Sequence, residues 1–296
     1  MQRGGCTVKI IFSRKGYDSA SGGIPSPIFP DGSFCSLPIP SDEPPLLKDV
    51  RFEGQSIGRI VDQLRPDKGL ADQGVHLDPD LDAGARPRLR GWRPCFGQAS
   101  GAQSHLAKHA VGKGDLFLFF GWFREVTVID HRCSYRSGAN DVHAIFGWLQ
   151  VGDVHHPGLD GKRPPKWTSD HPHVRDSHIN PRTNNTLYVA TDQLHLPGFH
   201  FKLAGGGTFK RFSPKLQLTE PGQGRSTRRL PSWIYPSQTN PALSYHSDMR
   251  RWRKDRKGVI LNTVGRGQEF VLDTKFYPDA LKWVHGLFGY PASDGG

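Results

Sequence analysis

Three short polar groups in this sequence have the residue types and spacing that chemistry needs. The first, SRKGYD at residues 13–18, directly follows an apolar run at residues 8–12 that predicts a strand. Chain segments that leave a rigid strand often carry reactive groups. We therefore predict that Arg14 and Lys15 contact phosphate or another anion and that Asp18 acts as a general acid or base.

The second group is HLDPDLD at residues 76–82. His76, Asp78 and Asp80 alternate along the chain, so in an extended conformation they would point to one side, which suits a divalent cation. Asp78 is also a candidate catalytic carboxylate. Because Pro79 separates the two acids, a charged turn closed by hydrogen bonds is the alternative that we favour here.

The third group lies at residues 264–271, where the sequence VGRGQEFV embeds Arg266, Gln268 and Glu269 among apolar residues. A buried carboxylate needs a partner such as Arg266, because its pKa otherwise rises. We predict that Glu269 does acid–base chemistry and that Arg266 and Gln268 contact the substrate.

Two later segments add candidates. A helix that ends near Gly112 would carry Gln103 and His105 on different flanks. Both are predicted to contact substrate, although a lone histidine is more often structural. A polar loop further on adds His171 and His173, whose spacing suits a metal without being specific for one.

A basic quarter of the chain is the main electrostatic feature. The net charge is +11, and residues 200–270 hold fourteen Lys or Arg against four acids. Arginines stand there beside aromatic residues, a combination that can stack on bases and pair with phosphates. The predicted nucleic-acid-binding residues are Arg225, Arg228, Arg229, Trp233, Arg251 and Arg253. The alternative is a solvated surface without a partner, with the aromatic residues in the core.

The elements that must position these groups predict an α+β fold with a mainly β core. Nearly continuous apolar runs at 116–123 and 144–151 indicate neighbouring strands that are buried on both faces. Helices are expected around 56–64 and 279–287. The 35 glycines and 24 prolines are spread along the chain, which favours short strands, peripheral helices and long loops. We expect a single domain over 1–296 that includes the basic quarter.

Cysteine usage and the lengths of apolar runs favour a cytoplasmic protein. The four cysteines, Cys6, Cys35, Cys95 and Cys133, have no paired spacing, which predicts reduced and packed thiols. The apolar run near the N-terminus gives no support for a signal peptide, and no run approaches the roughly 20 residues that span a bilayer. We therefore expect no membrane partner.

An ordered set of short motifs resembles one known family. The motifs are SRKGYDSASGGIPSPIFPDG, SLPIP, HLDPDLD, FGQASGAQSHL, GDLFLFFGWFR, HAIFGWLQVGDV, NNTLYVA, LPSWIYP, LSYH and GRGQEFV. Over residues from about 8 to 283, this set is similar to the nucleotide modification associated domain 3 family. The resemblance implies a role in pathways that modify nucleic-acid bases, often in phages or mobile elements, and it implies no particular reaction.

A fainter likeness concerns the Gly114-Asp115 turn and the two central strands. Together, residues 111–154 are similar to base-binding barrels of the PUA-like type, and this analogy implies a pocket for a flipped or modified base.

Three functions are compatible with these features. We favour an enzyme that modifies a nucleotide or a DNA base, with a divalent metal as a candidate cofactor. The second is a non-catalytic reader of modified bases in nucleic acid. The third, a metal-dependent nuclease or hydrolase in a defence system, ranks last because no complete nuclease signature is present. The chemistry is expected where the three polar groups meet the ends of the central strands.

Overall fold

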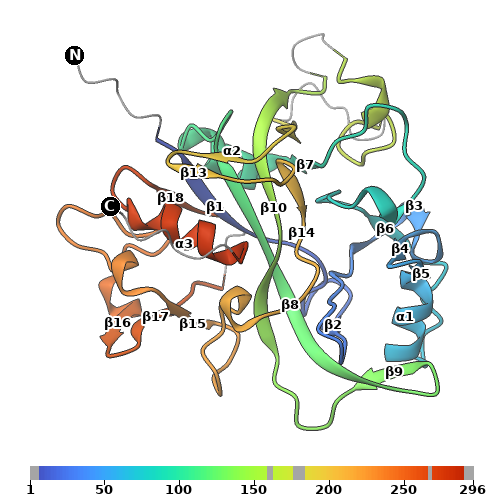
Figure 1. Cartoon of the computed structure of the whole chain (residues 1–296). Coiled ribbons are helices and arrows are strands. Elements are labelled where there is room, and N and C mark those ends of the chain that lie inside the picture. Colours follow the sequence, from blue (N-terminus) through green and yellow to red (C-terminus); the bar gives the residue numbers. More distant parts are fainter. Residues whose placement is uncertain (1–6, 159–162, 176–183, 266–268, 290–296) are drawn as a thin grey trace.

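The computed structural model of the chain describes residues 7–158, 163–175, 184–265 and 269–289. One large sheet forms its centre, and smaller sheets, short helices and long loops surround this sheet (Figure 1). The predicted α+β class with a mainly β core is therefore confirmed.

Two long strands, β8 (Leu116–Ile129) and β10 (Val142–His155), form the middle of the large sheet. They pair antiparallel, and every residue of the two apolar runs, 116–123 and 144–151, is buried. The prediction of neighbouring strands buried on both faces is thus confirmed.

The large sheet has the strand order β18-β1-β8-β10-β11-β7. The other strands of this path are β18 (Glu269–Asp273), β1 (Lys9–Arg14), β11 (Thr186–Ala190) and β7 (Cys95–Gln98). Three more strands pair beside the path: β2 (Ser26–Ile28), β9 (Arg132–Tyr135) and β14 (Gly206–Thr208). The described strands form an open sheet with β18 and β7 at its ends, and no closed barrel of the PUA-like type is found among them.

The register of β1 decides which side chains share a face of the sheet. β1 runs parallel to β8 and antiparallel to β18, and Ser13 lies opposite Glu269 while Phe12 lies opposite Phe270. Successive side chains of a strand point to opposite faces. Ser13 and Glu269 therefore occupy one face of the sheet, and Phe12, Arg14 and Phe270 occupy the other.

Smaller sheets flank this centre. A three-stranded sheet in the basic quarter contains β15 (Thr227–Leu230), β17 (Gly258–Asn262) and β16 (Trp252–Asp255). The two-stranded sheets are β3 (Ile39–Leu46) with β6 (Gly74–His76), β4 (Arg51–Phe52) with β5 (Gln55–Ser56), and β12 (His195–Leu196) with β13 (Phe199–His200). Short 3-10 turns include Leu47–Asp49, Ala83–Ala85, Lys166–Thr168, Pro214–Leu216, Ser232–Ile234 and Met249–Arg251.

The helices lie where the sequence predicts them. They are α1 (Ile57–Leu64), α2 (Ser100–Lys108) and α3 (Asp279–Leu287). Ser56 Oγ caps α1 by accepting from the Arg59 N–H at 3.4 Å. α2 ends before the expected Gly112, because Ala110 has a φ of 50°, which is outside the helical region.

Burial of the remaining groups agrees with the composition. Cys35, Cys95 and Cys133 are buried free thiols, as predicted, while Cys6 lies outside the described residues.

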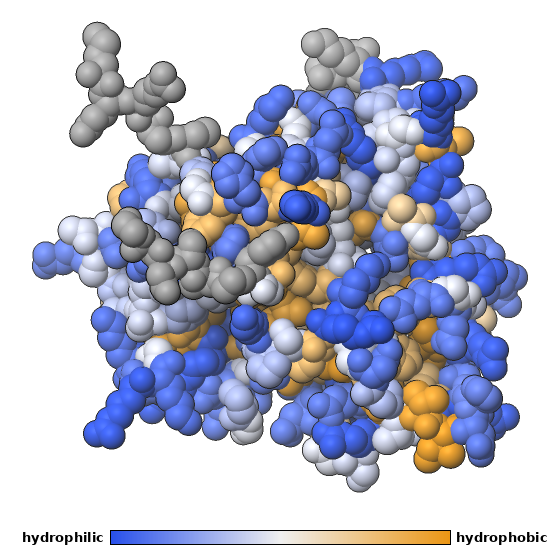
Figure 2. Space-filling view, in the orientation of Figure 1, coloured by the Kyte–Doolittle hydropathy of each residue, from blue (hydrophilic) through white to orange (hydrophobic). Residues whose placement is uncertain are grey.

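Figure 2 shows a surface that is largely hydrophilic over β15–β17 and carries apolar patches elsewhere. None of the helices that the structure describes is long and apolar enough to cross a membrane.

Candidate functional site

A buried lysine–glutamate pair joins the first and third polar groups. Lys15 Nζ lies 3.2 Å from Glu269 Oε1, and the two side chains are 6% and 1% exposed. The same oxygen accepts hydrogen bonds from Gln98 Nε2 at 2.6 Å and from Ser13 Oγ at 3.3 Å. Buried charges need such extra hydrogen bonds because they have lost their water. Lys15 Nζ also lies 4.6 Å from the centroid of the Phe96 ring, a cation–π contact.

The partner of Glu269 comes from a distant part of the chain. The sequence predicted that Glu269 needs a partner such as Arg266, and among the described residues Lys15 is such a partner because β1 and β18 are neighbours in the sheet. Arg266 and Gln268 lie outside the described residues. The hydrogen bond from Gln98 also links β7 to β18, so the two end strands of the open sheet meet at Glu269.

α2 carries two of the predicted substrate-contacting residues. Gln103 is buried, and its Oε1 accepts a hydrogen bond from the Tyr188 hydroxyl at 3.0 Å. His105 Nε2 lies 3.0 Å from Ser244 Oγ, and the His105 ring stacks on Tyr245 with centroids 4.2 Å apart. The two side chains contact different neighbours, as expected for different flanks of a helix.

The charge of Glu269 affects the pKa values of His105 and Tyr188. Burial lowers the pKa of His105, and His109 adds to this effect, while the charge of Glu269 opposes it. The pKa of Tyr188 is raised to about 12, mainly by burial; the hydrogen bond between Tyr188 and Gln103 opposes this shift, and the charge of Glu269 adds to it. At neutral pH an uncharged imidazole and an uncharged phenol therefore lie near the Lys15–Glu269 pair, and each can donate or accept a hydrogen bond.

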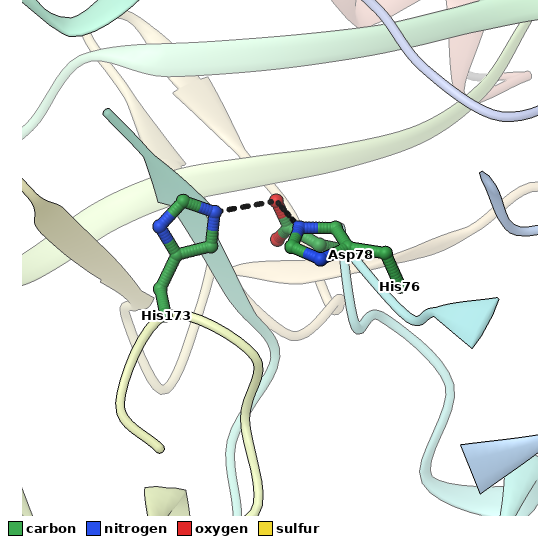
Figure 3. A group of neighbouring side chains, drawn as sticks. All are labelled: His76, Asp78 and His173. Atoms are coloured by element: carbon green, nitrogen blue, oxygen red, sulfur yellow. Dashed lines mark ion pairs between the residues drawn. The ribbon is translucent and has the colours of Figure 1, made fainter. Parts of the chain in front are cut away.

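His76, Asp78 and His173 form a compact group beside β7, which we call the metal-type cluster (Figure 3). His76 Nε2 and His173 Nε2 lie 3.8 and 3.7 Å from Asp78 Oδ2, and the candidate ligand atoms all lie within 4.8 Å of one another. His76 ends β6 and Asp78 follows it closely, whereas His173 comes from a later loop. Two imidazoles and a carboxylate form a typical ligand set for a divalent transition metal.

Further groups hold the Asp78 carboxylate in place. Its Oδ1 accepts a hydrogen bond from the Gly97 N–H at 2.8 Å, and His171 Nε2 lies 3.4 Å from the same oxygen. Burial by itself would raise the pKa of Asp78, but the neighbouring imidazoles of His171 and His76 hold it well below its usual range. A Cβ at Gly97 would lie 2.2 Å from the His173 ring, so glycine is required for this close approach.

Asp80 makes different contacts from those that alternation predicted. Arg88 donates to both carboxylate oxygens of Asp80 at 2.6 Å, and the backbone of Asp80 pairs with the backbone of Cys95. Because both oxygens of Asp80 are engaged by Arg88, the metal-type cluster contains His173 in its place.

A small cavity connects the first and second polar groups. It has a volume of about 90 Å³, and its lining includes Gly16, Ser36, Asp78 and Asp80. Gly16 directly follows Lys15, so the chain turn after β1 borders both the buried ion pair and the metal-type cluster. The structure thereby brings parts of all three polar groups together around Lys15 and β7.

The other face of β1 borders a second hollow, which has a volume of about 390 Å³. Arg14, His143, Arg225 and Arg228 line it, and we call it the basic hollow. Arg228 is only 5% exposed, and its guanidinium lies 4.3 Å from the centroid of the Phe120 ring. Among the described residues no carboxylate pairs with Arg228, and its Nε has no hydrogen-bond partner.

Like charges dominate the basic hollow. Burial lowers the pKa of Arg228 to about 9, and the charge of Arg14 contributes. Burial also holds the pKa of His143 well below its ordinary value, helped by Arg228 and then by Arg225. Asp18 is the one acid among the described lining residues, so the hollow has an excess of positive charge.

Two lining residues are held by local contacts. Arg225 donates to Ser19 Oγ at 2.8 Å and lies 3.9 Å from the centroid of the Trp122 ring. Asp18 Oδ1 accepts from the N–H groups of Ala20 and Ser21, both at 2.8 Å. The carboxylate of Asp18 therefore closes a turn at the rim of the hollow.

The other predicted nucleic-acid-binding residues lie outside the basic hollow: Arg229, Trp233, Arg251 and Arg253. Arg229 pairs with Glu220 at 2.7 Å and with Asp255 at 2.5 Å. Trp233 packs against Trp283 of α3, with ring centroids 6.2 Å apart. Of the predicted nucleic-acid-binding arginines, Arg225 and Arg228 thus line the hollow, whereas Arg229, Arg251 and Arg253 do not.

The chain belongs to the nucleotide modification associated domain 3 family, whose model matches residues 9–273. This membership suggests a role in nucleotide or nucleic-acid modification and confirms the resemblance seen in the motifs. No curated protein and no solved structure shows a significant match to the chain.

Sequence reasoning missed Gln98 and His143 as site residues and did not connect His173 to His76. Gln98 and His143 lie within apolar strand sequences, where nothing distinguishes them from other polar residues. The spacing of His171 and His173 suggested a metal, but only the fold shows that the second polar group supplies the other ligand atoms.

Proposed function

We propose that the protein binds a phosphate-bearing nucleotide or nucleic-acid strand at the basic hollow and acts as an enzyme in its modification. The observation that carries this proposal is the buried guanidinium of Arg228, which shares the hollow with Arg14 and Arg225 and has no carboxylate partner among the described residues.

Charge balance supports a phosphate as the occupant. A buried cation without a counter-ion is strongly destabilising, so an anion in the hollow would offset the desolvation of Arg228. Guanidinium groups bind phosphate through short, paired hydrogen bonds. The volume of about 390 Å³ falls within the usual range of small-molecule sites, roughly 300–1,000 Å³.

The Lys15–Glu269 pair is the proposed acid–base group of this enzyme. Both side chains are buried at the end of β1, and Gln98 orients the glutamate. Arg14 and Lys15 are consecutive, so the substrate site is proposed to lie around the end of β1, where the chain turns at Gly16. We assign the acid–base role to Glu269 rather than to Asp18, because the Asp18 carboxylate holds a turn.

A binding experiment tests the phosphate site. Binding of a nucleoside, its monophosphate and a short oligonucleotide would be measured by calorimetry with the wild type and with Arg228→Gln. We expect the monophosphate to bind more tightly than the nucleoside, and Arg228→Gln to weaken it by roughly 30-fold or more. Arg253→Gln, a change at an exposed arginine, is the control and should leave monophosphate binding unchanged. Equal affinity for nucleoside and monophosphate would refute the phosphate site.

Modification itself is tested by mass analysis of nucleosides. DNA and nucleotide pools from cells that contain the wild type would be compared with those from cells that contain Glu269→Gln. We expect a nucleoside of altered mass that disappears with the variant, because the variant keeps the shape of the side chain and loses its charge. Thermal unfolding of the purified variant is the control for folding, because the loss of one charge of the Lys15–Glu269 pair also lowers stability.

A non-catalytic reader of modified bases is the second candidate. The same arginines and the Trp122 ring below Arg225 favour it, since stacking and phosphate pairing suffice for binding. Binding that weakens steeply with salt, together with nucleosides of unchanged mass, would favour the reader over the enzyme.

A further inference from the structure

We infer that His76, Asp78 and His173 bind one divalent transition metal ion, of the zinc or iron(II) type, through His76 Nε2, His173 Nε2 and Asp78 Oδ2. This site is separate from the basic hollow, and the inference does not depend on phosphate binding there.

The spacing of the three atoms fits a common metal. Ligand atoms at about 2.0–2.2 Å from one ion lie roughly 3–3.6 Å from one another in tetrahedral or octahedral geometry. The two Nε2–Oδ2 distances of 3.8 and 3.7 Å are only slightly larger, and they are too long for ordinary hydrogen bonds. Small side-chain movements would therefore complete the coordination.

The hydrogen bonds of His173 favour the ligating tautomer. Asn185 Nδ2 donates to the His173 backbone carbonyl at 2.7 Å, which fixes the orientation of the amide. Asn185 Oδ1 then faces His173 Nδ1 at 2.7 Å and can only accept, so Nδ1 carries the proton. In the neutral ring the lone pair of Nε2 points toward Asp78 Oδ2. Two acceptors that face each other repel unless a cation lies between them.

The two oxygens of the Asp78 carboxylate have different roles: Oδ1 is held by neighbouring protein groups, and Oδ2 is the proposed metal ligand. Oδ1 of Asp78 accepts from the Gly97 N–H at 2.8 Å and lies 3.4 Å from His171 Nε2. His171 Nδ1 accepts from the His173 N–H at 3.2 Å, so the proton of a neutral His171 ring is on Nε2 and points toward Oδ1. Oδ2 remains for the metal, and His171 is a positioning residue rather than a ligand.

The site has an open side, as expected for a metal that meets a substrate. Asp78 borders the cavity of about 90 Å³ that also contacts Gly16, and the His76 side chain is 28% exposed. Three protein ligands leave at least one coordination position free for water or substrate. Imidazole nitrogens favour zinc, iron, cobalt or nickel over magnesium or calcium.

Metal binding to the full chain tests the site directly. The purified protein would be stripped with a chelator and titrated with Zn²⁺ and with Co²⁺, whose visible absorption reports nitrogen ligation. We expect one ion per chain and a higher midpoint of thermal unfolding when the ion is bound. His173→Ala and Asp78→Asn should each weaken binding by more than 100-fold, and Asn185→Ala by about 10- to 100-fold.

Matched variants separate this site from other effects. His200→Ala removes an exposed histidine outside the cluster and should leave the metal affinity unchanged. Arg228→Gln should also leave it unchanged, so failure of the phosphate site and failure of the metal site are distinguishable. A wild-type chain that takes up no stoichiometric ion would overturn the inference. So would His173→Ala and Asn185→Ala variants that bind the ion as the wild type does.

Discussion

Lys15 and Glu269 stabilise the end of β1 only as a pair. Each is buried, and each would be an uncompensated charge if its partner were removed. Breaking a buried ion pair from one side typically lowers stability by about 3–5 kcal/mol, whereas removing both charges costs much less.

This asymmetry predicts the outcome of a double-mutant cycle. We expect Lys15→Met to lower the free energy of unfolding by about 3–5 kcal/mol, and the double variant Lys15→Met/Glu269→Gln to lower it by less than Lys15→Met alone. Urea denaturation measures both. Lys48→Met, which breaks the exposed pair with Asp72, is the control and should change stability by at most about 1 kcal/mol. If Lys15→Met lowers the free energy of unfolding by no more than Lys48→Met does, the prediction is wrong.

At the scale of single residues, the sequence identified chemical types better than partners. Glu269 was recognised as a carboxylate in an apolar setting, but its partner Lys15 was not foreseen. A partner more than 200 positions away depends on strand pairing, and neither residue type encodes which strand will be the neighbour.

Among the elements, β7 connects the two chemical groups. Alternation along a strand sends Phe96 and Gln98 to the side of Lys15 and Glu269, while Gly97 contacts Asp78 and His173. One short strand thus supports both the ion pair and the metal-type cluster.

Gly97 is the position where this arrangement is most easily disturbed. Gly97→Ala would place a Cβ at 2.2 Å from the His173 ring, so that ring must move. We expect a loss of stability of roughly 1–3 kcal/mol and weaker binding of Zn²⁺. Thermal unfolding and calorimetry with Zn²⁺ measure the two effects.

The neighbouring helix offers a matched control. Gly101→Ala, near the start of α2, meets nothing within 4 Å and should leave stability unchanged or raise it by up to about 1 kcal/mol. If both substitutions have the same effect, the close contact at Gly97 is not important.

Elements with strong local patterns were predicted correctly. The apolar runs of β8 and β10 and the periodicity of α1 indicate which residues are buried from the sequence of each segment alone. Residues far away in the chain are not needed for this prediction. The neighbours of β1 in the sheet depend instead on pairing between segments far apart in the chain.

At the scale of the whole molecule, the free energy of unfolding depends on pH through buried neutral histidines, of which His246 is an example. His246 is fully buried, its Nδ1 contacts the Ser244 carbonyl at 2.9 Å, and its Nε2 accepts from the Val264 N–H at 3.3 Å. Burial lowers the pKa of His246 to about 4 from an ordinary value of 6.5. Protonation would place a second N–H against the donor from Val264.

The direction of the pH effect follows from proton binding. Below pH 6.5 the unfolded chain binds a proton at this position and the folded chain does not, so the free energy of unfolding falls until the pH reaches about 4. We expect about 1.4 kcal/mol per pH unit from this histidine. Urea denaturation at several pH values should show a smaller slope for His246→Gln than for the wild type. Identical slopes would exclude His246 as the source, and His200→Gln is the surface control.

The fold of the whole molecule also determines which of the excess basic residues are paired with acids. Fourteen basic residues occur between 200 and 270, but Arg228 and Arg225 reach the basic hollow while Arg229 is held by acids. Net charge therefore predicts attraction to polyanions, whereas the fold determines which arginines remain for a ligand.

The sequence by itself determined the β core, the helices, the buried thiols, the basic quarter and the family, because these follow from local apolar patterns, composition and ordered motifs. Only the tertiary structure decided that Lys15 pairs with Glu269, that His173 rather than Asp80 joins His76 and Asp78, and that Arg228 is buried with no carboxylate partner in the described part of the chain. Such contacts join segments from different strands and loops. Their geometry depends on register and burial, which no single segment of the chain contains.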